Sequence, residues 1–210
     1  MSSARLLGFV CLFDALAIIV LYPHLDLFSC GYLVCSTVLA LLQAVVNERF
    51  SNSAELQRLF YAKDIDRVWD RCVALLGLTE LAVFFEYSHW RPMPELLNRS
   101  AQILGLLLCI AGVIWLFWVD IYLMGQFPSH HRRGAPMTSG PYQRVRHPRY
   151  IGLLATRFAL PLIFGGVIAS MLAVIWFLLI RRRAHLEERY LRSRFGEAYT
   201  QYAARTIGIP

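Results

Sequence analysis

The sequence predicts an all-α, polytopic integral membrane protein with about six transmembrane helices, and three observations lead to this fold class. First, 57% of the 210 residues are hydrophobic and only 17% are charged, far from the balance of a soluble domain. Second, long apolar runs recur along the chain at the length that a bilayer-spanning helix needs. Third, the basic residues gather in alternate loops between these runs, as the positive-inside rule requires.

Four apolar runs in residues 1–125 are expected to be spanning helices, because each approaches or exceeds the roughly 20 residues required. A polar loop at 48–71 separates the second run from the third. The first run is not expected to be a signal peptide, because Asp14 interrupts its apolar core and no small-x-small cleavage site follows. The runs extend over about residues 5–22, 27–47, 72–87 and 100–125.

The apolar stretch at 150–181 predicts a helical hairpin. As one helix its 32 residues would be about 48 Å long, well beyond a hydrocarbon core of about 30 Å. Pro161, Gly165 and Gly166 lie at its middle, where a hairpin needs a break and a tight turn. We therefore expect two short helices here, followed by a tail helix from residue 182.

The charge distribution favours the same topology. With a hairpin, 18 of the 21 Lys and Arg residues share one side, whereas Arg91 and Arg99 lie opposite and Arg157 lies within the hairpin. The basic side is expected to be cytoplasmic, with both termini on it. The membrane would be the cytoplasmic membrane of a prokaryote or the endoplasmic reticulum of a eukaryote. Residues 126–210 would form a loop, the hairpin and the cytoplasmic tail helix, integrated with the first four spans in one domain.

Several other classes are disfavoured. Nucleic-acid binding is not expected, because the basic residues lie between apolar runs that no soluble groove could leave exposed. A zinc site and a Rossmann domain are not expected either, since the five cysteines form no CxxC and no GxGxxG is present. Residues 53–68, with a Ser53 cap signal and Leu56, Leu59 and Phe60 at helical spacing, predict either an interfacial helix or a plain connector.

Two polar segments flank the hairpin: TSGPYQRVRHPRYIG at 138–152 and EERYLRSRFGEAYTQYAARTIGIP at 187–210. The hairpin returns them to the same surface, which makes a shared pocket feasible. Pro148 suits the first turn of a helix, whose unpaired N–H groups attract a carboxylate. Tyr142 and Tyr150 offer flat faces for an adenine or a cation, although interfacial anchoring explains them equally well. Glu187 and Glu188, with Arg183 one turn earlier, are either site residues or a plain helical ion pair.

These motifs carry a resemblance. RHPRYIG, a hairpin-length apolar run and then EExxLxxxFGxxYxxY resemble the integral-membrane methyltransferase superfamily of isoprenylcysteine carboxyl methyltransferases and phospholipid methyltransferases. The resemblance covers roughly residues 126–210. It implies an S-adenosylmethionine-dependent methyltransferase that holds its cofactor between the hairpin and the tail. Its other partners would be the lipid bilayer and a membrane lipid or a prenylated substrate.

The resemblance also implies roles for particular residues. Arg183 would face the substrate and act as the catalytic residue, orienting an acceptor carboxylate that needs no general base. The segment GAPM at 134–137 departs from the His-x-Leu-Val run common in the prenylcysteine enzymes, so contacts there would use the backbone. Ala159 stands where the family often has glycine. The cofactor contacts implied are Tyr142, His147, Pro148, Arg149, Tyr150, Glu187 and the adjacent Glu188, then Gly134, Ala135, Pro136 and Met137, with Gln126 as a looser candidate.

Arg157 is a charge inside an apolar helix, which is costly in a membrane. Asp14, Glu80, Glu86 and Asp120 are its candidate partners, so a structural ion pair is one explanation. The other is that Arg157 binds an anionic lipid head group of the substrate.

Other functions remain open at this stage. A membrane sterol or steroid reductase using NADPH has a similar segment, although its pattern tends to place Glu after the glycine, where this chain has Leu153. A channel or transporter is disfavoured because nothing in the chain repeats or inverts. The acceptor (carboxylate, amine or hydroxyl) and the oligomeric state stay undetermined. An amine or hydroxyl acceptor would need proton removal, for which His147 and Glu188 are candidates.

Overall fold

The computed structural model describes residues 3–22, 24–51, 69–90, 99–133 and 135–209. Within this described part the chain is helical and contains no strand, apart from one isolated bridge between Val145 and Ile207. A π-helical turn, η1 (Glu86–Trp90), and a 3-10 turn, η2 (Gly140–Gln143), accompany the α-helices. These helices are α1 (Ser3–Leu21), α2 (Leu27–Ser51), α4 (Trp69–Phe85), α5 (Arg99–Arg133), α6 (Pro148–Phe164), α7 (Val167–Phe195) and α8 (Glu197–Ala204).

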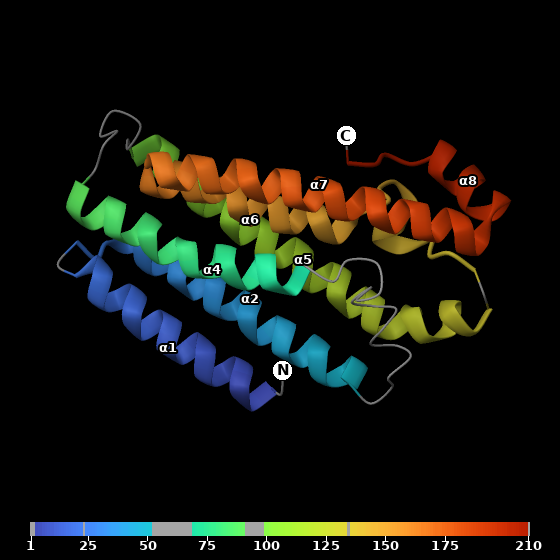
Figure 1. Cartoon of the computed structure of the whole chain (residues 1–210), viewed down its shortest axis with the longest axis horizontal. Helices are drawn as coiled ribbons and strands as arrows, with labels where there is room; N and C mark the ends of the chain where they lie inside the picture. The colour runs from blue at the N-terminus through green and yellow to red at the C-terminus, as the bar shows by residue number, and fades with distance from the viewer. Residues whose placement is uncertain (1–2, 23, 52–68, 91–98, 134, 210) are drawn as a thin grey trace.

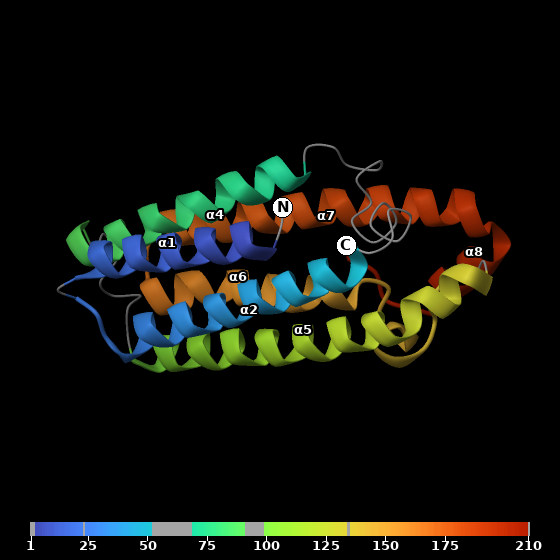
Figure 2. The same ribbon diagram turned by 90° about the horizontal axis from the view of Figure 1, so that it is seen from below.

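The six longer helices lie side by side and alternate in direction along the chain (Figures 1 and 2). We call the end with η1 and the α6–α7 turn the turn end. We call the opposite end, with the C-terminal half of α7, α8 and the loop before α6, the tail end. Both polar motifs of the sequence therefore lie at the tail end.

Among the residues that the structure describes, two helices are long and apolar enough to cross a membrane: α2 over Leu27–Val46 and α5 over Arg99–Gln126. The apolar part of α1, Gly8–Leu21, is shorter. The all-α class predicted from the sequence is confirmed. The six crossings and the membrane side of each loop stay predictions, because length and composition alone support the two spans.

The predicted hairpin is present. α6 ends at Phe164, and Gly165 follows in the left-handed conformation, with φ 59°, donating its N–H to the carbonyl of Pro161 at 2.9 Å. Glycine adopts this conformation without the steric cost that a Cβ imposes. Pro161 lies inside α6 rather than at the break, so the two glycines alone make the turn.

A buried carboxylate fixes the start of α7. Glu86, from η1, accepts hydrogen bonds from the backbone N–H groups of Val167 at 3.0 Å and Ile168 at 2.9 Å. These are two of the N–H groups that a helix start leaves without partners. A Cβ on Gly166 would collide with this carboxylate, so glycine is required there for close approach as well as for the turn.

Two boundaries differ from those predicted. α5 continues to Arg133, so the loop expected at 126–149 is shorter. α7 continues without interruption to Phe195, so the start of the predicted tail is an extension of the hairpin, and the separate tail helix is the short α8. The physical reason is that residues 181–195 contain strong helix formers and no Gly or Pro until Gly196. The interfacial helix considered at 53–68, with Ser53, Leu56, Leu59 and Phe60, lies outside the described residues.

Close packing of α5 against α6 positions the start of α6. At Gly112 and Gly152 an added Cβ would collide with the facing helix, so the two helices approach closely. The indole Nε1 of Trp115 on α5 donates to the carbonyl oxygen of Pro148 at 2.7 Å. Ala159 on α6, where the family often has glycine, is fully buried in the main core.

Candidate functional site

The site is built around the first residue before α6. α6 begins at Pro148, as predicted, and His147 lies just outside the helix with φ −126°. The imidazole of His147 is only 5% exposed and stacks on the ring of Tyr150 at 5.5 Å between centroids. Its position is therefore fixed by the α6 start itself.

Two carboxylates of α7 lie on either side of this imidazole. Nδ1 of His147 is 3.7 Å from an oxygen of Glu187, and Nε2 is 3.2 Å from an oxygen of Glu188. Arg146 donates from Nη1 to the same Glu188 oxygen at 2.8 Å. The two motifs that flank the hairpin in the sequence thus meet at the tail end.

Glu187 also accepts hydrogen bonds from a residue of its own helix, α7, and from a residue of α6. The Tyr150 hydroxyl donates to Oε1 of Glu187 at 2.5 Å, and Nε of Arg183 donates to the same oxygen at 3.1 Å. Arg183 is 3% exposed, so this guanidinium is held away from bulk solvent. The predicted ion pair of Arg183 and Glu187 is present, and it forms part of a larger network.

The pKa shifts describe an ionised cluster. Burial would lower the pKa of His147, but its contacts with Glu187 and Glu188 outweigh burial and raise it. Burial would raise the pKa of Glu187, yet the contact with His147, the hydrogen bond from Tyr150 and the charge of Arg183 lower it. The bond from His147 also lowers the pKa of Glu188. These shifts all favour the state in which two carboxylates face an imidazolium.

The C-terminal segment covers the loop that carries Arg146, a contact that the sequence did not predict. The N–H of Arg146 donates to the carbonyl of Ile207 at 2.9 Å, and the N–H of Ile207 donates to the carbonyl of Arg144 at 2.9 Å. The Tyr202 hydroxyl donates to the carbonyl of Tyr142 at 2.7 Å. The YxxY spacing of the tail was the signal that could have indicated this contact, because Tyr202 is its second tyrosine.

Two buried donors in this region have no hydrogen-bond partner: Nε of Arg146 and the hydroxyl of Tyr199. Both belong to residues that interact electrostatically with Glu188. Buried donors normally find an acceptor, so unpaired ones are a feature to explain. Their presence fits a ligand that brings an acceptor oxygen to this part of the site. Neither Arg146 nor Tyr199 was among the residues predicted from the sequence.

Arg149 is held by other helices. Its Nε donates to Asp120 of α5 at 2.9 Å, and its Nη2 donates to Gln43 of α2 at 2.5 Å. Asp120 is 2% exposed. Arg149 thus links α2, α5 and α6 beside the site, whereas its neighbours His147 and Tyr150 contact the carboxylates of α7.

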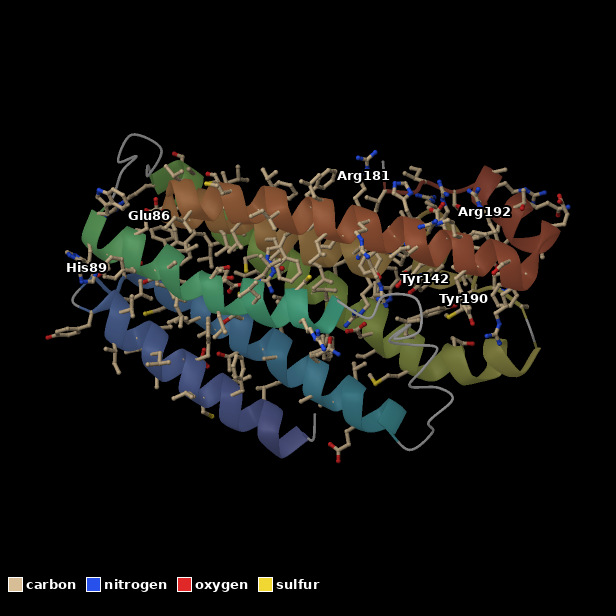
Figure 3. All side chains as sticks on the ribbon, viewed as in Figure 1. Glu86, His89, Tyr142, Arg181, Tyr190 and Arg192 are labelled. Atoms are coloured by element: carbon tan, nitrogen blue, oxygen red, sulfur yellow. The ribbon has the colours of Figure 1, made fainter. Side chains whose placement is uncertain are left out.

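The segment before η2 carries the less specific candidates. Ala135 is exposed, Pro136 and Met137 are half-buried, and Gly134 lies outside the described residues. Gln126 is exposed on α5. Tyr142 is half-buried in η2, at the tail end together with Tyr190 and Arg192 (Figure 3). None of the contacts described above for His147, Glu187 and Glu188 involves residues 135–137.

Arg157 lies apart from the site. It forms an ion pair with Glu80 of α4, and its guanidinium lies over the Trp176 ring at 4.7 Å from the centroid. The Tyr32 hydroxyl donates to the other oxygen of Glu80 at 2.9 Å. Arg157 is seven residues beyond Tyr150, about 10 Å deeper along α6. Of the acids considered from the sequence, Glu80 is the partner observed, which favours the structural explanation over a head-group ligand.

Comparisons with known proteins agree with this geometry. The phospholipid methyltransferase family model matches residues 100–198. The chain is 33% identical over 76 residues to a protein-S-isoprenylcysteine O-methyltransferase of Schizosaccharomyces pombe, covering 35% of this chain and 32% of that protein. It is 34% identical over 84 residues to protein-S-isoprenylcysteine O-methyltransferase B of Arabidopsis thaliana, covering 39% and 41%.

A longer alignment joins the chain to methanethiol S-methyltransferase 2 of Bradyrhizobium diazoefficiens, with 26% identity over 163 residues, 70% of this chain and 61% of the relative. The chain thus spans less than two thirds of the length of each of these relatives. No solved structure matches the chain.

The fold and site define an all-α integral membrane protein with a charged site at one end of its C-terminal hairpin. Within that class, residues 100–198 match the phospholipid methyltransferase family, and shorter segments are similar to isoprenylcysteine O-methyltransferases.

Proposed function

We propose that the protein is an S-adenosylmethionine-dependent methyltransferase that modifies a lipid-borne acceptor at the cytoplasmic surface of the membrane. The observation that carries this proposal is the meeting of the two motifs, with His147 between Glu187 and Glu188. The family match over residues 100–198 supports the reaction class. The named relatives, which methylate prenylcysteine or methanethiol according to their names, support the same chemistry.

The residues at the tail end fit the functional groups of S-adenosylmethionine. The carboxylates of Glu187 and Glu188 suit its ammonium group or ribose hydroxyls, because they act only as acceptors. The unpaired donors of Arg146 and Tyr199 suit its carboxylate. When bound, the cofactor supplies a methyl group activated by the sulfonium. Further proposed contacts are those expected from the resemblance: Tyr142, His147, Pro148, Arg149, Tyr150, Gln126 and residues 134–137.

The state of His147 bears on the acceptor. Since each ring nitrogen faces a carboxylate and the pKa is raised, the surroundings favour the form with a proton on both nitrogens. A doubly protonated imidazole cannot act as a general base. This favours an acceptor that is already ionised, such as a lipid-borne carboxylate, which Arg183 would orient through its guanidinium. Fixing both reactants in place can then lower the barrier by about 7 to 11 kcal/mol.

A second candidate acceptor is a thiol. The alignments with methanethiol S-methyltransferases cover 70% of this chain, whereas those with the prenylcysteine enzymes cover 35% and 39%. The thiolate is the nucleophilic form, and a free thiol with a pKa of about 8.5 must lose its proton before transfer, whereas a carboxylate is already ionised.

The cofactor is tested first by calorimetry on the purified full chain in detergent. We expect saturable binding of S-adenosylmethionine and its demethylated product, and no binding of NADPH. Binding of NADPH alone would overturn the methyltransferase proposal in favour of a reductase. The acceptor is then tested with methyl-labelled cofactor and three probes: a prenylcysteine carboxylate, an amine phospholipid and a small thiol. Mass spectrometry identifies which probe gains the label.

The orientation in the membrane is a separate proposal, supported by the distribution of basic residues. Both termini and the loop around Arg146 should face the cytoplasm. Single cysteines introduced near residues 140 and 200 should react with an impermeant label from the same side of sealed vesicles. Labelling from opposite sides would show that the hairpin does not return the chain to its starting side.

A further inference from the structure

A cavity lies at the turn end, remote from the site around His147. It has a volume of about 700 Å³ and is bounded by the start of α2, Tyr87 of η1 and the first three turns of α5. Arg99 at its mouth is 21 residues before Asp120, which contacts Arg149 beside the site. At 1.5 Å per residue that separation is about 30 Å along α5. The cavity therefore belongs to a different part of the molecule from the proposed cofactor site.

The mouth of this cavity carries one acid and one base. Asp26 is held in place by the Tyr87 hydroxyl, which donates to Oδ2 at 2.6 Å, and by the N–H of Ser29, which donates to Oδ1 at 2.8 Å. Arg99 is exposed at the first residue of α5. A carboxylate and a guanidinium thus line the same opening.

The deeper wall is apolar and faces outward. Leu27, Ile103, Leu107 and Ile110 line it and are 76%, 50%, 59% and 40% exposed. These residues belong to α2 and α5, the two helices that are apolar and long enough to span a membrane. Leu106 closes the bottom against α2, where a Cβ on Gly31 would collide with it. A charged mouth above an apolar, lipid-facing wall matches the shape of an amphiphile.

We propose that this cavity binds a zwitterionic phospholipid as a tightly held lipid of the leaflet opposite the site. The phosphate lies at Arg99, the cationic head group lies at Asp26, and an acyl chain runs along Leu107 and Ile110. Asp26 and Arg99 together select a lipid whose head group carries both a cation and a phosphate. An anionic lipid such as phosphatidylglycerol offers Arg99 the same phosphate but brings no cation to Asp26, and an uncharged sterol offers neither charge.

Lipid retention on the purified full chain tests the proposal. The protein, in detergent with equal amounts of phosphatidylcholine and phosphatidylglycerol, is analysed by native mass spectrometry. We expect preferential retention of phosphatidylcholine. Leu107→Trp, which fills the cavity, should lower that retention roughly tenfold, the factor for about 1.4 kcal/mol. Leu104→Trp is the matched control, since Leu104 lies on the same helix at 58% exposure but does not line the cavity. Equal retention of both lipids, or equal losses in the two tryptophan variants, would overturn the proposal, because the cavity would then bind lipid no more selectively than the rest of the lipid-facing surface.

The charge arrangement is tested by two further variants. Arg99→Gln should lower phosphatidylcholine retention roughly tenfold, the loss of one charge-assisted hydrogen bond. Asp26→Asn should shift the preference toward phosphatidylglycerol, because the carboxylate that favours a cationic head group is gone. Retention that responds to neither variant would overturn the proposal. S-adenosylmethionine binding should be unchanged in all four variants, so this result stands or falls separately from the proposed methyl transfer.

Discussion

Two groups of the same three residue types lie along the α6–α7 hairpin. In the middle of the bundle, Arg157 pairs with Glu80, which also accepts the hydroxyl of Tyr32. At the tail end, Arg183 pairs with Glu187, which also accepts the hydroxyl of Tyr150. We call these the middle triad and the end triad. Each contains an arginine, a glutamate and a tyrosine, so composition does not distinguish them.

The surroundings of the two triads distinguish them. The middle triad lies among apolar side chains of the main core, with Tyr32 2% exposed, Glu80 4% exposed and Trp176 beneath the guanidinium. The end triad adjoins His147, which leads on to Glu188 and to the unpaired donor of Arg146. Unpaired donors alone do not separate the two groups, because Nε of Arg157 is also buried without a partner. The difference is that apolar side chains enclose the middle triad, whereas the end triad continues into further charged groups at the tail end. The comparison indicates a structural role for the middle triad and a binding role for the end triad.

The largest expected effect concerns the middle triad. Arg157→Leu leaves the Glu80 carboxylate buried without its cation and should destabilise the fold by about 3 to 5 kcal/mol. Thermal unfolding in detergent measures this loss. The double variant Arg157→Leu/Glu80→Leu should recover most of it, because neither charge remains buried. S-adenosylmethionine affinity of the folded fraction should not change. If activity disappears while the melting temperature is unaffected, Arg157 is a head-group ligand after all.

The next effect concerns the end triad. Glu187→Gln should weaken S-adenosylmethionine binding by about 1.5 to 3 kcal/mol, the range for a hydrogen bond to a charged group. Calorimetry measures the change, and Glu197→Gln, an exposed glutamate at the start of α8, is the matched control.

Arg183→Ala should abolish turnover, since the guanidinium offers only donors and suits an anionic acceptor. Its cost in cofactor affinity should stay within about 0.5 to 1.5 kcal/mol, because Glu187 loses only one of its donors. Equal losses of cofactor affinity in the Arg183 and Glu187 variants would show that their ion pair acts as one structural unit.

A pH series should show a smaller effect on stability, which comes from the end triad and the neighbouring His147 and Glu188. The raised pKa of His147 means that its contribution to stability is complete below the ordinary value of 6.5 and is lost as the pH rises through the raised pKa. The lowered pKa values of Glu187 and Glu188 mean that their contributions are complete above the ordinary 4.5 and are lost as the pH falls through the lowered values. Melting temperature should therefore be highest between these limits.

His147→Gln is the control for the pH series. It should remove the decline on the alkaline side, because the titrating imidazole is gone, while an acidic decline from other carboxylates persists. An alkaline decline that is identical in the variant would show that another group, not His147, causes it.

Local features of the site were predictable from the sequence. The start of α6 at Pro148 and the hairpin break at Gly165 and Gly166 follow from backbone chemistry, and both are confirmed. The convergence of His147 with Glu187 follows from the hairpin, because two segments flanking a hairpin return to the same end.

Long-range pairings were not predictable in the same way. Arg157 had four candidate acids, and Glu80, 77 positions away, is its partner only because α4 packs against α7, the neighbour of α6 in the hairpin. The pairing of Arg149 with Asp120 likewise depends on the rotation of α5 about its axis. The bridge from Val145 to Ile207 joins two irregular segments, for which no periodic pattern exists. The unbroken α7 was missed because the apolar stretch ends at residue 181, whereas the helix ends only at Gly196.

The smallest expected effect compares the two tyrosines directly. Each hydroxyl donates to the glutamate of its triad, at 2.9 Å in Tyr32 and 2.5 Å in Tyr150, so replacement by Phe removes one hydrogen bond in both. Each loss should be worth about 0.5 to 1.5 kcal/mol, but in different observables. Tyr32→Phe should lower the melting temperature and leave S-adenosylmethionine affinity unchanged, because its glutamate serves only the fold. Tyr150→Phe should change cofactor affinity, because Glu187 loses the donor that orients it. Calorimetry and thermal unfolding on both variants decide the matter, and identical profiles would mean that the two triads do not differ in role.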